Sequence, residues 1–184
     1  MKHFISRRNF LKAVGVTAAA SAMAAAVPQA SAGFLTGKDA AVTILYTNDV
    51  HTYIDHKSPK LTYAAIAAMK QGYVDEGKPV LLVDAGDHIQ GTAYGSMDDG
   101  ATIIELMNEA GYDIATLGNH EFDYGMARAK AIIKEADFPY VSCNWVDLRT
   151  GLRVLPAVKL FPAGGKWIAF VGITTPESFT KSTP

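Results

Sequence analysis

Val80-Leu81-Leu82-Val83-Asp84-Ala85-Gly86-Asp87 is an uninterrupted apolar run that ends in two carboxylates. Pro79 precedes the run and Gly86 follows it, so residues 80–83 are expected to form a short, fully buried strand. Asp84 and Asp87 would then stand at the carboxyl end of that strand. This unit, a buried strand followed by a polar loop, is the basis of the fold prediction.

The same unit occurs before and after this run. Residues 42–47 are expected to form a strand that ends in Asn48-Asp49-Val50-His51, and residues 114–117 one that ends in Gly118-Asn119-His120-Glu121-Phe122-Asp123. Apolar residues at helical spacing predict helices over 61–77, from a cap at Asp98 or Asp99 to Gly111, and over 126–133. With a fourth strand at 138–143, the elements alternate as β-α-β-α-β-α-β.

The pattern changes after Asn144. Residues 152–161 and 167–173 look like strands separated by Gly164-Gly165, which favours an antiparallel hairpin. The sequence then ends at Pro184, with no closing helix expected. The predicted fold class is therefore a layered α/β domain, occupying residues 41–184 and incomplete at its C-terminus.

The three polar loops are candidates for a metal site. Loops beyond the carboxyl ends of strands in an α/β sheet share one crevice, so the three loops are expected to converge. Converging carboxylates repel one another unless a cation lies between them. Oxygen and imidazole ligands together suit Mn, Fe, Co or Zn better than Ca. The candidate ligands are Asp49, His51, Asp87 and Asn119.

Each candidate also has an ordinary structural explanation. Asp49 and His51 would project to the same side of an extended backbone and could share one metal, but they could equally be an Asx turn and a surface histidine. Asp87 has two oxygens that could bridge two cations, although an Asp after Gly86 is also a common strand-to-loop turn. Asn119 could simply cap a helix. The coincidence of three such loops favours the metal site.

His120 and Asp123 are the candidate catalytic residues. If the turn after the strand is helical, their three-residue spacing lets Asp123 accept a hydrogen bond from one ring nitrogen of His120 while the other faces substrate. Asp84 and Glu121 are expected to support the ligands from behind. His88 and Gln90 are expected to be ordinary loop residues.

The first 32 residues have the three parts of a secretory signal: a basic start, an Ala-rich run over residues 13–27, and Ala30-Ser31-Ala32. Residues 6–12 (Ser-Arg-Arg-Asn-Phe-Leu-Lys) resemble a twin-arginine signal, which implies the twin-arginine translocation machinery as a partner and a periplasmic or extracellular location. Cleavage is expected before Gly33, with residues 33–40 as a linker. The run is too short for a permanent membrane anchor, and an uncleaved signal is the alternative.

The 184 residues are 49% hydrophobic and 19% charged, as in an ordinary soluble protein. Cleavage removes four Lys/Arg and no Asp/Glu from a total of 17 and 18, leaving 13 basic against 18 acidic residues and a net charge of −5. This charge disfavours binding to a nucleic acid polymer. Cys143 is the single cysteine and cannot form an intrachain disulfide, which fits folding in the cytoplasm before export.

The three motifs resemble those of the 5'-nucleotidases within the calcineurin-like metallophosphoesterases, over residues 42–175. The resemblance implies a β-sandwich flanked by helices and a nucleotide phosphoesterase or UDP-sugar hydrolase that activates water with two divalent metal ions. It assigns Asp49 and His51 to one metal and Asn119 to the other, with Asp87 bridging both. His120 and Asp123 would form the catalytic dyad.

One part of the family pattern is missing. The family supplies further ligands from downstream Gly-His motifs, whereas no histidine follows His120 here. The family's C-terminal nucleobase-binding domain is also absent, so the chain alone is expected to bind metal weakly and to have little or no activity. The alternatives are another hydrolase of the superfamily, either a cyclic-nucleotide phosphodiesterase or a sulfur-oxidation thiohydrolase, and a non-catalytic exported binding fragment.

Overall fold

The computed structural model describes residues 41–53 and 61–182. The signal peptide expected over residues 1–32 and the linker expected over residues 33–40 lie outside these ranges, so both stay predictions. Within the described ranges, no helix has the length and apolar character that crossing a membrane requires.

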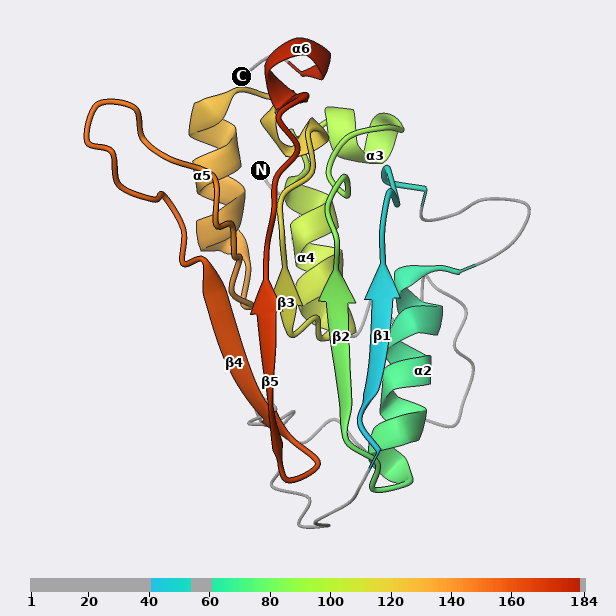
Figure 1. The fold of residues 1–184 in the computed structure, drawn as a ribbon. Helices are drawn as coiled ribbons and strands as arrows, with labels where there is room; N and C mark the ends of the chain where they lie inside the picture. Colours follow the sequence, from blue (N-terminus) through green and yellow to red (C-terminus); the bar gives the residue numbers. More distant parts are fainter. Residues whose placement is uncertain (1–40, 54–60, 183–184) are drawn as a thin grey trace. The chain divides into compact units, whose positions relative to one another are not determined.

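Three short strands form a parallel sheet: β1 (Thr43–Thr47), β2 (Val80–Asp84) and β3 (Ile114–Ala115). β2 lies between the other two. Figure 1 shows the strands side by side and pointing in the same direction. Their carboxyl ends therefore share one edge of the sheet, and the three polar loops begin there.

Three longer helices accompany the sheet: α2 (Tyr63–Asp75), α4 (Ala101–Ala110) and α5 (Met126–Glu135). All three were expected from the spacing of apolar residues. The hydroxyl of Thr62 caps α2, and Gly111 ends α4 in the left-handed conformation that glycine tolerates best.

The hydrophobic core lies between the helices and the sheet. Leu81 and Leu82 of β2 are almost completely buried, as the uninterrupted apolar run predicted. Ile66 from α2, Met107 from α4 and Ile132 from α5 belong with Leu82 to one buried cluster. This packing fixes β2, and with it the position at which the acidic loop leaves the sheet.

The start of α4 differs in detail from the prediction. The N-cap is Gly100, not Asp98 or Asp99, and its φ of 84° explains why a glycine is there. Asp98 nevertheless supplies the capping oxygen, because its carboxylate accepts the N–H of Thr102 at 3.0 Å. Asp99 lies between them with a φ of 52°.

The predicted hairpin is present, as β4 (Val158–Ala163) and β5 (Lys166–Val171) paired antiparallel. Gly164 and Gly165 form the turn with φ angles of 57° and 74°. Two consecutive positive φ angles are what a tight two-residue hairpin turn of the I′ type requires.

The fourth strand expected over residues 138–143 was wrong as a regular element. The structure has a single parallel bridge between Ala115 and Tyr140 instead. β3 is only two residues long because the chain leaves the sheet for its polar loop, so it offers little for another strand to pair with. The segment still connects sheet and hairpin, since Cys143 N–H donates to Gly172 O at 2.8 Å.

Three short helical turns complete the described part: α3 (Ala93–Ser96), the 3₁₀ turn η1 (His120–Phe122) and α6 (Ser178–Lys181). The expectation of no helix after the hairpin was wrong, because α6 follows it. η1 lies directly beyond β3 and carries His120 into the site described next.

Candidate functional site

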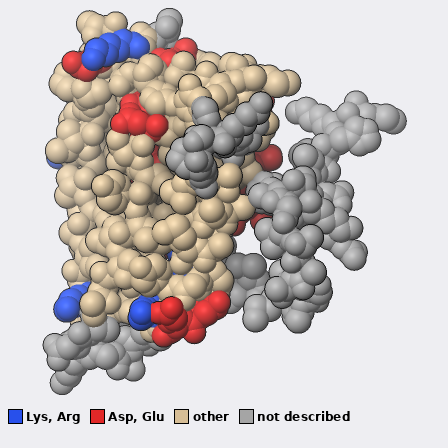
Figure 2. All heavy atoms as spheres, turned by 90° about the vertical axis from the view of Figure 1, so that its right-hand side faces the viewer, with Lys and Arg blue, Asp and Glu red and all other residues tan. Residues whose placement is uncertain are grey.

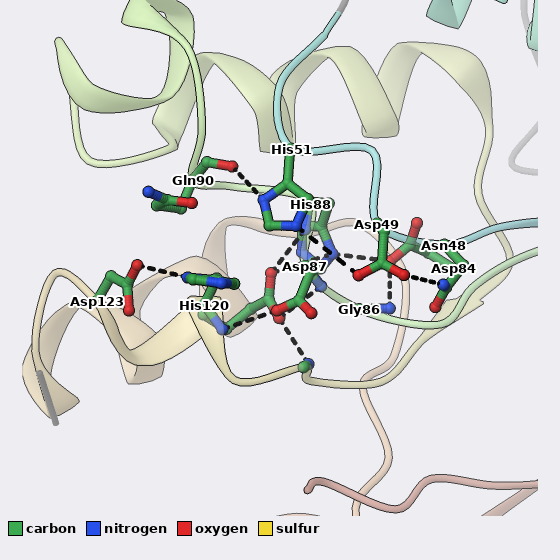
Figure 3. Close-up of polar contacts among 12 residues, drawn as sticks. Asn48, Asp49, His51, Asp84, Gly86, Asp87, His88, Gln90, His120 and Asp123 are labelled. Carbon is green, nitrogen blue, oxygen red and sulfur yellow. Dashed lines mark hydrogen bonds and ion pairs between the residues drawn. The ribbon is translucent and has the colours of Figure 1, made fainter. Parts of the chain in front are cut away.

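The loops after β1 and β2 bring three of the four predicted ligands together. Asp49 and His51 come from the first loop and Asp87 from the second. One potential ligand atom from each of the three lies within 4.8 Å of the other two. Figure 3 shows these side chains pointing toward one another, with His120 from the loop after β3 beside them. The expected convergence of loops is therefore present.

The backbone conformation of these three residues differs from the predicted one. Asp49, His51 and Asp87 have φ angles of 53°, 46° and 58°, in the left-handed region rather than in extended backbone. The two loops are tied together, since Asp49 N–H donates to Gly86 O at 3.1 Å and His51 N–H to Asp87 O at 2.9 Å. Such conformations cost about 1–3 kcal/mol each and are common at functional sites.

Asp87 is the most central of the candidate ligands. Its Oδ1 accepts the backbone N–H of His120 at 2.7 Å, which connects the second loop to the third. Burial raises the pKa of the Asp87 carboxyl; the His120 N–H opposes this, while the nearby carboxylates of Glu121 and Asp49 add to it. A positive charge close to Asp87 would relieve both the burial and the repulsion.

Gly118 makes room for the Asp87 carboxylate. A Cβ atom at position 118 would lie 2.3 Å from Asp87 Oδ1, a distance that no side chain could tolerate without displacing the carboxylate. Glycine is therefore needed at position 118 because of the space that the Asp87 carboxylate occupies, and not because of its backbone φ angle.

His120 and Asp123 lie side by side on the turn η1. His120 Nδ1 is 2.7 Å from Asp123 Oδ2, as their spacing predicted. Burial lowers the pKa of His120, but the hydrogen bond and charge of Asp123, together with the charges of Asp87 and Glu121, raise it by more, so the net shift is upward. The ring of His120 also meets the ring of His51 edge-on, with centroids 4.9 Å apart. The pair therefore borders the candidate ligand cluster.

Asn119 is the N-cap residue of η1, yet its side chain makes no capping hydrogen bond. Its amide nitrogen is buried and has no hydrogen-bond partner among the described residues. The helix-cap explanation for Asn119 is therefore wrong. A buried amide left without a partner fits a group that binds something from outside the chain.

Gln90 was expected to be an ordinary loop residue, but its backbone carbonyl lies 3.0 Å from His51 Nδ1. A carbonyl can only accept a hydrogen bond, so Nδ1 is the donor in this contact, and in the neutral ring the lone pair is then on Nε2. Nε2 is the atom that faces Asp49, at 3.8 Å from its Oδ1. Of the two neutral tautomers, the one with Nδ1–H is therefore the one that leaves Nε2 able to bind a metal.

Residues 42–180 match the family model described as calcineurin-like phosphoesterase. The chain belongs to this family. It is 35% identical to human 5'-nucleotidase over 161 residues and 35% identical to the snake venom 5'-nucleotidase of Gloydius brevicauda over 159 residues. These alignments cover 78% of this chain but only 28% and 27% of the two relatives.

Solved structures agree with the sequence comparison. The 5'-nucleotidase precursor from Thermus thermophilus superimposes with a TM-score of 0.69 at 30% identity, covering 78% of this chain and 30% of that one. The NAD nucleotidase of Haemophilus influenzae gives a TM-score of 0.68 at 26% identity, covering 78% of this chain and 28% of that one. The predicted family and fold class are thereby confirmed. Divalent metals are the cofactor class of this family, and the Asp49, His51 and Asp87 group could hold one.

Behind the ligand cluster of this calcineurin-like phosphoesterase lies the fully buried carboxylate of Glu121. It accepts three backbone N–H groups, from Asp87 at 2.9 Å, from His88 at 2.8 Å and from Gly118 at 2.6 Å. The Glu121 side chain therefore binds the loop after β2, at Asp87 and His88, to the loop after β3, at Gly118.

Asp84 is also buried, but its hydrogen bonds go to residues other than the candidate ligands. Its carboxylate accepts from Gly86 N–H at 2.8 Å and from the Thr47 hydroxyl at 2.6 Å, and it pairs with His88 Nδ1 at 2.8 Å. Asp84 thus stabilises the turn that leads to Asp87.

His88 is the residue that sequence reasoning missed. It is fully buried between Asp84 and Glu121, and its Nε2 lies 2.8 Å from the hydroxyl of Tyr140. Burial lowers the pKa of His88, but the two carboxylates raise it by more, to about 9. The four-residue spacing from Asp84 and the apolar Ile89 beside it were the available signals.

Proposed function

We propose that the phosphoesterase site of this chain, once completed by the downstream ligands that its family supplies, hydrolyses phosphate esters of nucleotides with two divalent cations of the Mn, Zn, Co or Fe type. The proposal is supported above all by one observation: donor atoms of Asp49, His51 and Asp87 lie within 4.8 Å of one another beside the hydrogen-bonded pair of His120 and Asp123.

The donor set fits divalent cations of this class. Two carboxylates and one imidazole with its Nε2 free provide the mixture of oxygen and nitrogen ligands that these metals prefer. The amide oxygen of Asn119 would supply a further neutral ligand, while its buried, unpartnered nitrogen is free to donate a hydrogen bond to an acceptor such as a phosphate oxygen. In the proposed arrangement Asp49 and His51 would hold one cation and Asn119 the other, and Asp87 would be shared by both.

Bound cations would polarise the phosphate and lower the pKa of the attacking water. The chain's own contribution centres on His120. Its Nδ1 is held by Asp123, so the other ring nitrogen is left to meet substrate, and the raised pKa of His120 favours the protonated ring. A protonated ring can donate to the oxygen on which charge develops and can pass its proton to the leaving alcohol.

A nucleotide substrate is supported by the relatives. The matched proteins include human and snake venom 5'-nucleotidases and a bacterial NAD nucleotidase. A nucleic acid polymer is not expected as a partner: Figure 2 shows only scattered Lys and Arg side chains on the face that it presents. The chain spans less than a third of each of these relatives, so the whole proteins' activity is a proposal for this one.

The test combines metal binding with turnover. The full-length protein, with the downstream ligands present, is titrated with Mn²⁺ by calorimetry and then assayed with AMP, UDP-glucose, cyclic AMP and a thiosulfate ester. Mn²⁺-dependent release of phosphate from AMP, or of UMP and glucose 1-phosphate from UDP-glucose, supports the proposal. Turnover of cyclic AMP or of the thiosulfate ester alone favours another hydrolase of the superfamily, and AMP binding without turnover favours a binding fragment.

His120→Asn separates chemistry from metal binding. We expect Mn²⁺ affinity to be kept and turnover of the preferred ester to fall by about 10²-fold or more. Full turnover in this variant would remove His120 from the mechanism.

We also propose that the chain is exported. The support is the Ser6-Arg7-Arg8 motif, the Ala-rich run and the small residues before Gly33. Removal of residues 1–32 would deliver the phosphoesterase to the periplasm or the outside of the cell.

A further inference from the structure

The loop that carries His51 is held in an unfavourable backbone conformation. Asp49, His51 and Thr52 all have positive φ angles, of 53°, 46° and 59°. Asp tolerates this region, whereas for a β-branched residue such as Thr it is a genuine outlier. Thr52 is also completely buried. Contacts from outside the loop must therefore keep Thr52, and the His51 peptide next to it, in place.

Those contacts come from Thr92, in the loop between β2 and α3. Thr92 N–H donates to Thr52 Oγ1 at 2.6 Å, and the Thr92 hydroxyl donates to the Thr52 carbonyl at 3.1 Å. The two hydroxyl oxygens are 2.7 Å apart. Because the Thr92 proton is already used, the Thr52 hydroxyl donates in this third bond. Both hydroxyl protons of the pair and the Thr92 N–H thus have an acceptor.

The two residues before Thr92 contact His51 itself. Gly91 passes so close that a Cβ there would lie 2.0 Å from the His51 carbonyl oxygen. The Gln90 carbonyl is the acceptor for His51 Nδ1, at 3.0 Å. Residues 90–92 therefore fix His51 at the ring and at the backbone, and the bonds between Thr52 and Thr92 hold the two loops together.

We propose that Thr52 and Thr92 are positioning residues that set the ring orientation and the tautomer of His51. The bonds between Thr52 and Thr92 keep the Gln90 carbonyl against Nδ1, so that Nε2 faces Asp49 and Asp87 and carries the lone pair in the neutral ring. The use of that lone pair as a metal ligand rests on the proposed function. The tautomer does not, and it can be measured without metal.

The test compares matched threonine variants of the full chain. Thr52→Val and Thr92→Val remove one hydroxyl each at nearly constant volume. Thr62→Val is the control, because Thr62, like Thr92, is a helix N-cap whose hydroxyl accepts a backbone N–H, but it caps α2. Thr52→Ser is the conservative variant that keeps the hydroxyl. Circular dichroism verifies that each variant is folded.

The first measurement is the protonation pattern of His51 by ¹H–¹⁵N NMR in EDTA, with the His51 signals assigned from a His51→Gln variant. The wild type, Thr62→Val and Thr52→Ser are expected to show Nδ1–H alone. Thr52→Val and Thr92→Val are expected to show a mixture of both tautomers. If Thr52→Val does not fold, Thr92→Val decides.

The second measurement is Co²⁺ affinity from the visible absorption spectrum. Thr52→Val and Thr92→Val are expected to bind about 10- to 100-fold more weakly than the wild type, the usual effect of losing a partner of a metal ligand. Thr62→Val and Thr52→Ser should stay within a factor of two or three.

The outcomes separate this proposal from the proposed function. An unchanged Nδ1–H pattern in folded Thr52→Val and Thr92→Val, or an equal loss of Co²⁺ in Thr62→Val, overturns the positioning role. A wild type that binds no Co²⁺ while the valine variants still lose the Nδ1–H form supports the positioning role and overturns the metal site.

Discussion

The carboxylate of Glu121 accepts the backbone N–H of Asp87 at 2.9 Å, across 34 residues of sequence. Gly118 N–H shares the same oxygen, and His88 N–H uses the other one. Glutamine has only one acceptor oxygen in its side chain, so Glu121→Gln would leave at least one buried N–H facing an NH₂ group. We expect the variant to lose about 3 kcal/mol or more of unfolding free energy, measured by urea denaturation.

Glu135→Gln is the matched control for Glu121→Gln. Glu135 pairs with Arg128 through both oxygens, but its side chain is 44% exposed. Loss of this ion pair should lower the free energy of unfolding by less than about 1 kcal/mol. Equal losses for the two variants would show that burial of the Glu121 carboxylate has no special effect.

Asp87→Asn should weaken metal binding and stabilise the metal-free protein. Asparagine can still accept the His120 N–H, but it has no charge with which to hold two cations. Because folding raises the pKa of Asp87, mainly by burial, the charged carboxylate opposes folding at pH 7 when no metal is present. We expect Mn²⁺ affinity to fall by at least about 10-fold, and the melting temperature in EDTA to rise. Unchanged Mn²⁺ affinity would contradict a bridging role.

Asp123→Asn should lower the pKa of His120. Burial lowers this pKa, and the upward shift that outweighs it comes first from the hydrogen bond and charge of Asp123. Without that carboxylate, burial is less strongly opposed and less of the ring is protonated at neutral pH. Titration of the His120 ring signals by NMR, in EDTA, measures the change. A pKa that stays where it was would mean that Asp123 does not control His120.

Gly118→Ala should disturb the site although it replaces none of the candidate ligands. The new Cβ would meet Asp87 Oδ1 at 2.3 Å, so the carboxylate has to move. We expect a loss of Mn²⁺ affinity of about 10-fold or more. Gly72→Ala is the control: it lies in α2 with nothing within 4 Å of its Cβ position, and should stabilise the fold by about 0.5–1 kcal/mol. Normal Mn²⁺ binding by Gly118→Ala would argue against the close contact.

Export should depend on the arginine pair. Replacing Arg7 and Arg8 by Lys keeps the charge but removes the pair, so the protein is expected to stay in the cytoplasm. Mass spectrometry of exported wild type should find Gly33 at the N-terminus. Lys2→Gln, which changes a basic residue outside the pair, should be exported normally. Exported protein that begins at Met1 would refute the cleavage prediction.

Much of the fold was accessible from the sequence because its signals are local. The short apolar run before Asp84 favours a buried strand, and the Gly164-Gly165 pair favours a tight hairpin turn. The meeting of the three loops followed from the geometry of parallel strands. The bond between His120 and Asp123 followed from their spacing on a helical turn.

The missed features depend on contacts between distant residues. No local pattern indicates that Thr52 takes a φ of 59°, because its own preference is against it and Thr92, 40 residues later, overrides that preference. His88 looked like a loop residue because its partner Tyr140 is 52 residues away. The prediction of a fourth strand over residues 138–143 was wrong for a related reason. A regular strand there would need a longer β3 to pair with.

All the candidate ligands and the catalytic pair come from one unbroken stretch, from Asp49 to Asp123, and β4 and β5 contribute none of them. The candidate site is therefore encoded by one contiguous segment, which a single exchange of sequence would transfer between related proteins.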